Sequence, residues 1–287
     1  MHEFTMPERQ ALAAILELAI REDLGSIGDV TSLATIPAHV TGKAAFVARR
    51  EGVLAGLPVC KRTIERIDPA IRFLPLLEDG NPLQPGYWIA TIEGAMRSIL
   101  AVERIALNSL QRLSGIASLT RRYVDAVAGT NAKILDTRKT LPGWRLLEKY
   151  AVRLGGGTNH RNGLYDGLLI KDNHLAAMRN NIEEAIRHCR EANPSLPIEI
   201  EVDSLEQFER ALACKPDIIL LDNMNFDQLR RAVWRRGESA PAVLLEASGG
   251  VNLDTVRGIA ETGVDRISVG AITHSATALD IGLDFVE

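Results

Sequence analysis

The sequence predicts an α/β protein in which a short, incomplete parallel β/α barrel is joined to an α+β sandwich domain. After Ala132, strand-like runs alternate with helical segments at intervals of roughly 20–35 residues, which is typical of successive βα units and a parallel sheet. The first hundred residues mix helices and strands without this alternation, which favours an α+β arrangement. An eight-stranded barrel typically needs about 250 residues. The region from Ala132 to Ala271 is too short for that, so we expect an incomplete barrel.

The first domain is expected to begin with a helix. Thr5 and Glu8 have the spacing of a capping box, and apolar residues then recur at helical spacing. The residues around Asp29 are interpreted as a loop. Strands are expected at 44–50, 53–55, 71–77 and 87–92, and a helix at 59–67.

A long helical region begins near Met96, and Ser114-Gly115 is expected to break it into two helices. We assign residues 1–110 to the first domain and residues 111–274 to the barrel. The C-terminal stretch 275–287 alternates polar and apolar residues with a period of two, which is typical of a strand. We expect this strand to return to the first domain.

The predicted barrel contains six strands separated by five helices. The strands are expected at 132–135, 168–170, 198–200, 218–221, 243–245 and 266–269, and the helices at 144–154, 182–191, 205–213, 226–235 and 253–262. In parallel α/β proteins the working residues lie at the carboxyl ends of the strands. Because all six predicted ends are polar or rich in glycine, the sequence predicts one site on one rim.

The composition is that of an ordinary globular protein and argues against several functional classes. A net charge of −4 over 287 residues disfavours nucleic acid as a partner. No uncharged apolar run is long enough to predict a membrane span. The polar N-terminus is unlike a signal peptide, so the cytoplasm is the expected compartment. Three widely spaced cysteines predict neither a disulfide framework nor a zinc site.

The character of the strand ends changes along the chain. The first two are mainly cationic, the next two carry carboxylates, and the last two are rich in glycine. In order, they are Asp136-Thr137-Arg138-Lys139, Lys171-Asp172-Asn173-His174, Glu201-Val202-Asp203, Asp222-Asn223, Glu246-Ala247-Ser248-Gly249-Gly250 and Ser268-Val269-Gly270-Ala271. Such dense cations in an acidic chain indicate a ligand with several negative charges.

The glycine-rich ends are expected to bind a terminal phosphate. Glycines let the backbone of Ser248-Gly249-Gly250 and Gly270-Ala271 come close to the anion, and the N–H groups at the start of the following helix would receive it. His274 either assists this binding or caps a helix.

The two carboxylates Glu201 and Asp222 are expected to face the middle of the ligand. Carboxylates accept hydrogen bonds from sugar hydroxyls and hold hard cations such as Mg²⁺. Ion pairs with Lys171 or Lys139 are the alternative, and both arrangements are compatible with an empty site.

Six segments of the chain form a distinctive set: DTRKTLPGWR, GGGTNHRNGLYDGLLIKDNH, EVDS, LLDN, EASGG and SVGA. In this order they closely resemble the quinolinate phosphoribosyltransferase family, most strongly from Glu103 to Phe285. The resemblance implies a glycosyltransferase that moves phosphoribose from phosphoribosyl pyrophosphate to quinolinate, a pyridine dicarboxylate. Loss of CO₂ then gives nicotinate mononucleotide, a step of de novo NAD biosynthesis.

The resemblance also implies how the dicarboxylate is bound. Arg138, His160 and Arg161 would hold the two carboxylates, with Thr137 nearby. These residues lie in the cationic stretch that the charge pattern alone points to.

The catalytic residues implied by the resemblance lie on four strand ends. Lys139 and Lys171 would meet quinolinate and the pyrophosphate, and Glu201 and Asp222 would take the ribose hydroxyls and Mg²⁺, directly or through water. The family further implies a homodimer in which Arg104 enters the site of the neighbouring subunit. From the sequence pattern alone, Arg104 is interpreted as a surface arginine.

Three alternative functions are compatible with the same residues. The first is phosphoribosyl transfer to another anionic ring, such as nicotinate. The second is an aldolase-like barrel with Lys139 or Lys171 as a Schiff-base lysine, although such a lysine prefers a less polar pocket. The third is a regulator that binds phosphorylated metabolites without catalysis.

Overall fold

The computed structural model describes residues 4–286 and divides into two compact units. One unit contains the chain up to Arg121, Thr140–Gly156 and the chain from Thr273 onward. The other contains Arg122–Lys139 and Gly157–Ile272. The stretch Thr140–Gly156, which lies between the first two barrel strands and which the predicted boundaries place in the barrel domain, is therefore grouped with the first unit.

The first unit is built on an antiparallel sheet with the strand order β12-β1-β5-β3. Its elements are α1 (Met6–Leu24), α2 (Val30–Thr35), β1 (Thr41–Ala48), β2 (Gly52–Val53), α3 (Leu57–Ile67), β3 (Arg72–Pro75), β4 (Pro82–Leu83), β5 (Trp88–Ala95), α4 (Met96–Ala126), α5 (Arg145–Leu154) and β12 (Ile281–Val286). The C-terminal strand β12 pairs with β1, in the register Phe46 opposite Leu283.

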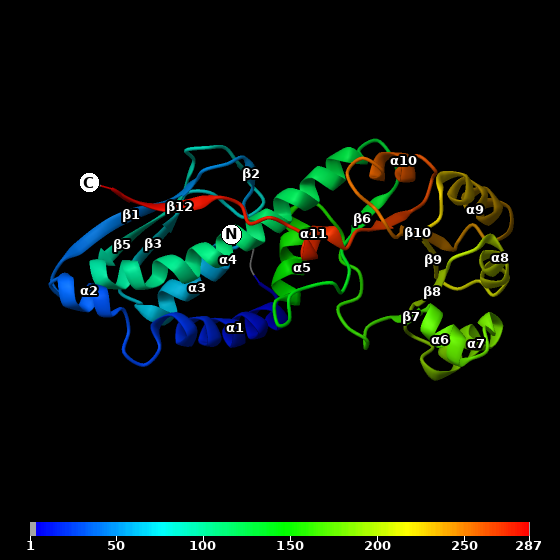
Figure 1. Ribbon diagram of the computed structural model, residues 1–287, viewed down its shortest axis with the longest axis horizontal. Helices are drawn as coiled ribbons and strands as arrows, with labels where there is room; N and C mark the ends of the chain where they lie inside the picture. The colour runs from blue at the N-terminus through cyan, green and yellow to red at the C-terminus, as the bar shows by residue number, and fades with distance from the viewer. Residues whose placement is uncertain (1–3, 287) are drawn as a thin grey trace. The chain divides into compact units, whose positions relative to one another are not determined.

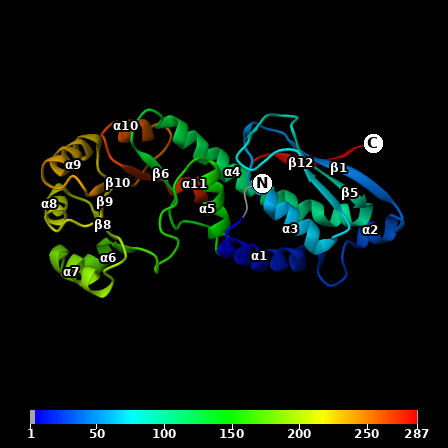
Figure 2. The ribbon, with the colours of Figure 1, turned by 180° about the vertical axis from the view of Figure 1, so that it is seen from behind.

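The core of this unit is apolar and lies between the sheet and two helices. Figures 1 and 2 show α3 and α4 running along the sheet. Phe46 and Ile92 from the strands pack in one buried cluster with Ile64 of α3 and Leu110 of α4. Because alternate strand residues point to the same face, Ala44, Phe46 and Ala48 of β1 all contribute to this core.

The first helix confirms the predicted capping box. The Thr5 side chain accepts a hydrogen bond from the Glu8 N–H at 3.5 Å, and the Thr5 N–H donates to the Glu8 carboxylate at 2.7 Å.

Two predictions about this unit are wrong. Residues 30–35 form helix α2 instead of a loop, because the Asp29 side chain caps it by accepting from the N–H groups of Thr31 and Ser32. Helix α4 is continuous through Ser114-Gly115. Gly115 serves close packing, since a Cβ there would lie 2.1 Å from the carbonyl oxygen of Thr277.

The second unit contains the predicted parallel sheet of six strands, which confirms the fold class. Its elements are β6 (Lys133–Leu135), β7 (Leu168–Ile170), α6 (Asp172–Ala177), α7 (Ile182–Ala192), β8 (Ile198–Val202), α8 (Leu205–Ala213), β9 (Ile218–Asp222), α9 (Phe226–Ser239), β10 (Leu244–Ser248), α10 (Val256–Ala260), β11 (Arg266–Ser268) and α11 (Ala271–His274). Helices α7, α8 and α9 cover the outer side of the sheet (Figures 1 and 2).

The sheet is a barrel that is open at one place. Its strand order is β6-β11-β10-β9-β8-β7, so β6 joins the last strand while, within residues 4–286, β6 and β7 do not pair. Beside β6, the N–H of Thr158 donates to the carbonyl of Ile134, and the N–H of Asp136 donates to the carbonyl of Thr158. The segment around Thr158 thus adds a short parallel bridge at the open edge.

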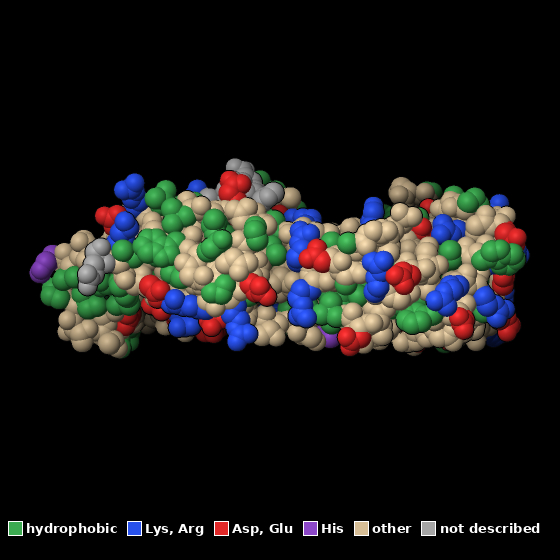
Figure 3. All heavy atoms as spheres, turned by 90° about the horizontal axis from the view of Figure 1, so that it is seen from above, with side chains coloured by type: hydrophobic (Ala, Val, Ile, Leu, Met, Phe, Trp, Pro, Cys, Tyr) green, Lys and Arg blue, Asp and Glu red, His purple; other side chains and the backbone are tan. Residues whose placement is uncertain are grey.

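The outer surface carries both signs of charge. On the face shown in Figure 3, Lys and Arg side chains are interspersed with Asp and Glu side chains. Every helix within the described range is either too short or too polar to cross a lipid bilayer.

Candidate active site

A cavity of about 630 Å³ opens at the carboxyl ends of the barrel strands. Its walls come from every strand of the sheet and from the segment that follows Thr158. The lining residues are Thr137, Arg138, Lys139, His160, Arg161, Leu169, Lys171, Glu201, Leu220, Asp222, Asn223, Glu246, Ser248, Gly249, Gly250 and Ser268. All of them belong to the second unit.

Most of the residues predicted for the site line this one cavity. Those that do are Thr137, Arg138, Lys139, His160, Arg161, Lys171, Glu201, Asp222, Ser248, Gly249 and Gly250. Gly270, Ala271, His274 and Arg104 are not among the lining residues. Arg104 lies on α4 with its side chain 58% exposed, and His274 contacts the hydroxyl of Ser275.

The cationic wall of the cavity is formed by Arg138 and Arg161. Arg161 donates from Nη1 to the carbonyl of Gly167 at 3.0 Å, which fixes its direction. Burial lowers the pKa of Arg161, and the positive charge of Arg138 lowers it further. An anion that contacts both guanidinium groups would offset this effect on Arg161.

Asp136 holds the segment that carries His160. Its carboxylate is fully buried at the end of β6. One oxygen accepts from the His160 N–H at 2.8 Å, and the other accepts from the Asn159 side chain at 2.6 Å. Both oxygens of Asp136 therefore tie His160 and Arg161 to the first barrel strand.

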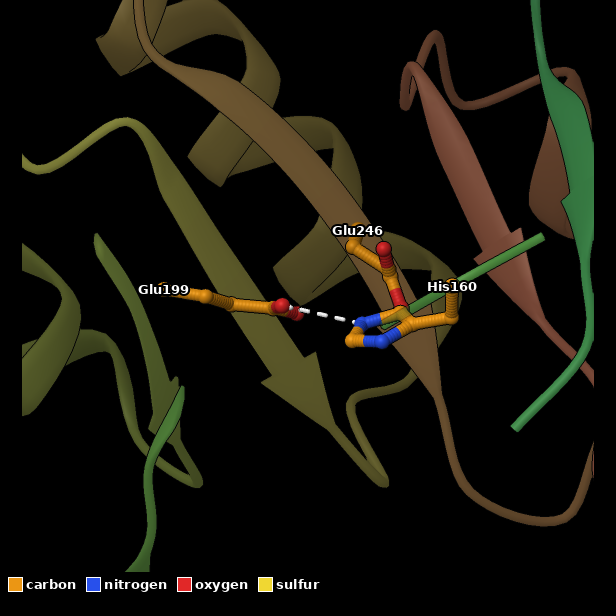
Figure 4. A group of neighbouring side chains, drawn as sticks. All are labelled: His160, Glu199 and Glu246. Atoms are coloured by element: carbon orange, nitrogen blue, oxygen red, sulfur yellow. Dashed lines mark ion pairs between the residues drawn. The ribbon is translucent and has the colours of Figure 1, made fainter. Parts of the chain in front are cut away.

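Below the rim lies a buried group of charged residues, which we call the floor cluster: His160, Glu199, Glu246 and Arg266. The Nε2 atom of His160 is 2.9 Å from a Glu199 oxygen and 3.5 Å from a Glu246 oxygen. The other Glu246 oxygen is 2.7 Å from Nε of Arg266. Figure 4 shows the two carboxylates directed at the imidazole ring from different strands.

The chemistry of the floor cluster argues against a metal ion there. His160, Glu199 and Glu246 have ligand atoms within 4.8 Å of one another, as a cation site requires. However, Nδ1 of His160 accepts a hydrogen bond from the Arg161 N–H at 2.8 Å. This bond assigns the ring proton to Nε2, the atom between the carboxylates, and Arg266 already neutralises one of them.

Burial and charge in the floor cluster shift the pKa of Glu246 and of His160. Burial, followed by the charge of Glu199, raises the pKa of Glu246 to about 7. Burial lowers the pKa of His160, but the hydrogen bond and charge of Glu199 and the charge of Glu246 outweigh burial and raise it. The Arg161 N–H opposes this rise, because a protonated imidazole has no acceptor nitrogen.

The two predicted carboxylates lie above this cluster, at the ends of β8 and β9. Glu201 forms an ion pair with the Lys171 ammonium group, the alternative that the sequence left open. Asp222 accepts a hydrogen bond from the Asn223 side chain at 2.7 Å. The pair supplies hard oxygen donors in one cavity, which fits a magnesium ion.

The glycine end of the cavity is a loop with left-handed backbone. Gly249 has φ of 90° and Gly250 has φ of 61°. A Cβ at Gly249 would lie 2.2 Å from the Asn223 side-chain oxygen, so only glycine fits. Helix α10 begins at Val256, whereas the sequence predicted a helix from residue 253, so the start of the helix lies further from the glycines than expected.

The floor cluster as a unit was not predicted from the sequence. The sequence placed Glu246 at a strand end but pointed to no role for it, and nothing in the sequence pattern pointed to Glu199 or Arg266. The signal was a period of two: Glu199 and Glu201 share one face of β8, and Glu246 shares one face of β10 with Ser248. Glu201 and Glu246 lie inside β8 and β10, but each was interpreted as the first residue after its strand.

This fold and cavity define an α/β-barrel protein that binds a ligand with several negative charges. Residues 29–114 match the profile of the quinolinate phosphoribosyl transferase N-terminal domain, and residues 116–284 match that of the C-terminal domain. The chain belongs to the quinolinate phosphoribosyltransferase family.

Curated relatives and solved structures agree with this assignment. The chain is 49% identical to a nicotinate-nucleotide pyrophosphorylase (carboxylating) of Mycobacterium leprae, over 96% of this chain and 98% of the relative. A probable enzyme of the same name from Bacillus subtilis is 41% identical, over 95% and 93%. The nicotinate-nucleotide pyrophosphorylase of Francisella tularensis superposes with a TM-score of 0.91 at 35% identity, covering 98% of each chain.

Proposed function

We propose that this chain transfers phosphoribose from phosphoribosyl pyrophosphate to quinolinate and removes one carboxylate, giving nicotinate mononucleotide, pyrophosphate and CO₂. The observation that carries the proposal is a single cavity lined by arginines beside β6, by carboxylates at the ends of β8 and β9 and by the glycine loop after β10. Family membership supports the same reaction. The product places the enzyme in NAD biosynthesis.

The cationic wall suits a dicarboxylate better than a single carboxylate. Arg138 and Arg161 each present a planar fork that matches a carboxylate bidentately. We assign one carboxylate of quinolinate to each arginine, with Thr137 beside them. His160 already uses both ring nitrogens on Glu199 and the Arg161 N–H, so in the empty site it acts on substrate through the position of Arg161.

Catalysis of the transfer step relies on charge placement. Departure of pyrophosphate leaves positive character at the anomeric carbon, which the carboxylates of Glu201 and Asp222 stabilise. Lys139 and Lys171 neutralise the leaving group. The reaction needs no covalent intermediate, because positioning the two substrates supplies a large share of the rate enhancement.

Glu201 and Asp222 are the residues proposed to hold Mg²⁺, directly or through water. The ion would neutralise charge on the pyrophosphate. To bind it, Glu201 must give up part of its ion pair with Lys171, which frees the lysine for substrate. The assignment predicts that Glu201→Gln weakens Mg²⁺ binding, measured by calorimetry with Mg²⁺ and phosphoribosyl pyrophosphate.

The phosphate of the sugar is assigned to Ser248, Gly249 and Gly250. Their loop offers backbone N–H groups without a side chain at either glycine, and a Cβ at Gly250 would meet open space. A contribution to phosphate binding stays a prediction for Gly270, Ala271 and His274.

A homodimer with a shared site is also proposed, on the strength of the family resemblance. Arg104 has an exposed side chain whose ion-pair contact, with Glu103, is 3.9 Å long. Mixing Arg104→Ala subunits with Lys139→Ala subunits should restore part of the activity if Arg104 enters the neighbouring site. The cytoplasmic location stays a prediction.

The test of the proposed function is incubation with quinolinate, phosphoribosyl pyrophosphate and Mg²⁺. One CO₂ should be released for each pyrophosphate. Release of pyrophosphate with nicotinate and without CO₂ would support the alternative acceptor instead. A Schiff-base role is disfavoured because Lys171 lies in an ion pair with Glu201 in a cavity lined by charged residues, whereas such a lysine usually lies in an apolar pocket, and borohydride should trap no adduct.

A further inference from the structure

The decarboxylation half of the reaction needs a proton as well as a binding site. When the bond to the departing carboxylate breaks, its electron pair stays on the ring carbon. CO₂ leaves, and the carbon forms a bond to a proton. The cationic ring nitrogen stabilises the carbanion, but it cannot supply that proton. An acid at or near the cavity must therefore supply it.

The floor cluster contains one carboxylate more than its permanent cation balances. Arg266 pairs with Glu246, and His160 lies between Glu246 and the second carboxylate, Glu199. With His160 neutral, as its bond to the Arg161 N–H favours, one added proton brings the cluster to neutrality. Burial of an uncompensated charge is expensive, so this proton is bound strongly.

Glu246 is the member best placed to hold this proton. Its carboxyl group is fully buried and poorly supplied with hydrogen-bond donors: neither oxygen has a partner of good geometry within the described residues, and the Ser268 side chain lowers the pKa of Glu246 by less than burial raises it. It also borders the cavity, together with His160. The charged groups that act on it are Glu199 from β8, His160 from the bridging segment and Arg266 from β11.

We propose that the floor cluster is a proton store, in which Glu246 takes up one proton as the dianionic substrate binds above it and gives that proton to the ring carbon that loses CO₂. Substrate carboxylates next to Glu246 disfavour its charged form, so binding and proton uptake are coupled. After decarboxylation the cluster carries one net negative charge. A proton from solvent refills the store as the next substrate binds. The inference rests on the proposed function.

The first test measures proton uptake directly. Calorimetric titration of the full-length enzyme with quinolinate, in buffers of different ionisation enthalpy near neutral pH, should reveal uptake of a proton in the wild type. Glu246→Gln keeps the shape of the side chain but removes its titration, so the uptake should disappear. Unchanged uptake in this variant overturns the proposal.

The second test separates the two chemical steps. Glu246→Gln should form pyrophosphate in a single turnover at close to the wild-type rate, while CO₂ release slows by about 100-fold or more, as is typical when a general acid is lost. Quinolinate mononucleotide should accumulate. Glu246→Asp keeps an acid and should recover much of the rate, and the exposed Glu261→Gln serves as the control.

The outcomes distinguish this inference from the proposed function. If the wild type forms no pyrophosphate from these substrates, the proposed function is wrong. If the wild type forms nicotinate mononucleotide and Glu246→Gln releases CO₂ equally fast, only the proton store is wrong. Should Glu246→Gln fail to fold, the wild type still decides: its rate of CO₂ release must fall as pH rises above the range in which the store is filled, and a flat profile overturns the proposal.

Discussion

The two sheets of this protein use their buried faces in opposite ways. The antiparallel sheet of the first unit buries Phe46, Ile89 and Ile92 against apolar helix residues. The parallel sheet of the second unit buries Glu199 and Glu246 beneath a cavity. The difference teaches that an alternating strand pattern specifies which residues share a face, but not whether that face serves stability or chemistry.

The two faces differ because a buried carboxylate needs specific interaction partners, whereas a buried apolar side chain does not. An apolar face gains about 25 cal/mol for each Å² removed from water and needs no specific partner. A buried carboxylate needs a cation, a proton or a hydrogen-bond donor. The second unit provides these through Arg266 and His160, which come from separate parts of the chain.

The largest effect should come from breaking the apolar face. Phe46→Ala removes a side chain that is 1% exposed and should lower the free energy of unfolding by about 3–5 kcal/mol. Phe285, in the neighbouring strand of the same sheet, is 49% exposed and is the matched control. Denaturant unfolding of both alanine variants measures the contrast. Equal losses would contradict the position of the core.

The next largest effect is expected in the affinity for quinolinate when an arginine of the cationic wall is removed. Arg161→Ala leaves a carboxylate of quinolinate without its partner, which typically costs about 2–5 kcal/mol and weakens affinity by roughly 30-fold or more. Arg230, an exposed arginine on α9, gives the control substitution. Equilibrium binding of quinolinate measures both variants. Near-normal affinity in Arg161→Ala would refute the assignment.

The two units should also respond to pH in opposite directions. Burial raises the pKa of Glu8, but hydrogen bonds from Arg153 and Thr5 outweigh this, so the pKa is lowered overall. Stability from Glu8 is present above its unfolded pKa and is lost as pH falls through the folded value. Glu246 has a raised pKa of about 7, so the folded state binds more protons and stability falls as pH rises from about 4.5 to 7.

Gln variants at these two positions test the opposing slopes. Glu8→Gln should flatten the acid side of the curve of unfolding free energy against pH. Glu246→Gln should flatten the decline toward neutral pH. If both variants change the same side of the curve, the contrast between the two carboxylates is wrong.

The smallest effect is expected on the outer surface of the barrel. Glu183 pairs with Arg210 at 2.7 Å, but half of the Glu183 side chain is exposed. Solvent-exposed pairs of this kind contribute about 0.2–1 kcal/mol. Glu183→Gln should therefore lower the free energy of unfolding by less than about 1 kcal/mol, measured by the same denaturant series. A larger loss would contradict the view that this exposed ion pair contributes little to stability.

Short-range patterns in the sequence were enough to predict most helices and strands and the polar carboxyl ends of the barrel strands. The capping box at Thr5, the six strands of the barrel and the polar strand ends all follow from short-range patterns that hold wherever the chain goes. Nine of the eleven predicted residues that line the cavity lie at these strand ends, whereas His160 and Arg161 were assigned to the site through the family resemblance. Continuity of α4 at Gly115 did not follow, because the carbonyl that demands a glycine there comes from Thr277, far along the chain.

Only the tertiary structure decided which charges meet. Glu199, Glu246 and Arg266 lie on three different strands. His160 lies just after Thr158, in a segment whose sequence has no strand pattern. Their shared proton depends on distances between side chains that are separated in sequence and adjacent in space. The physical reason is that charge and burial act through space, whereas periodicity and capping act along the chain.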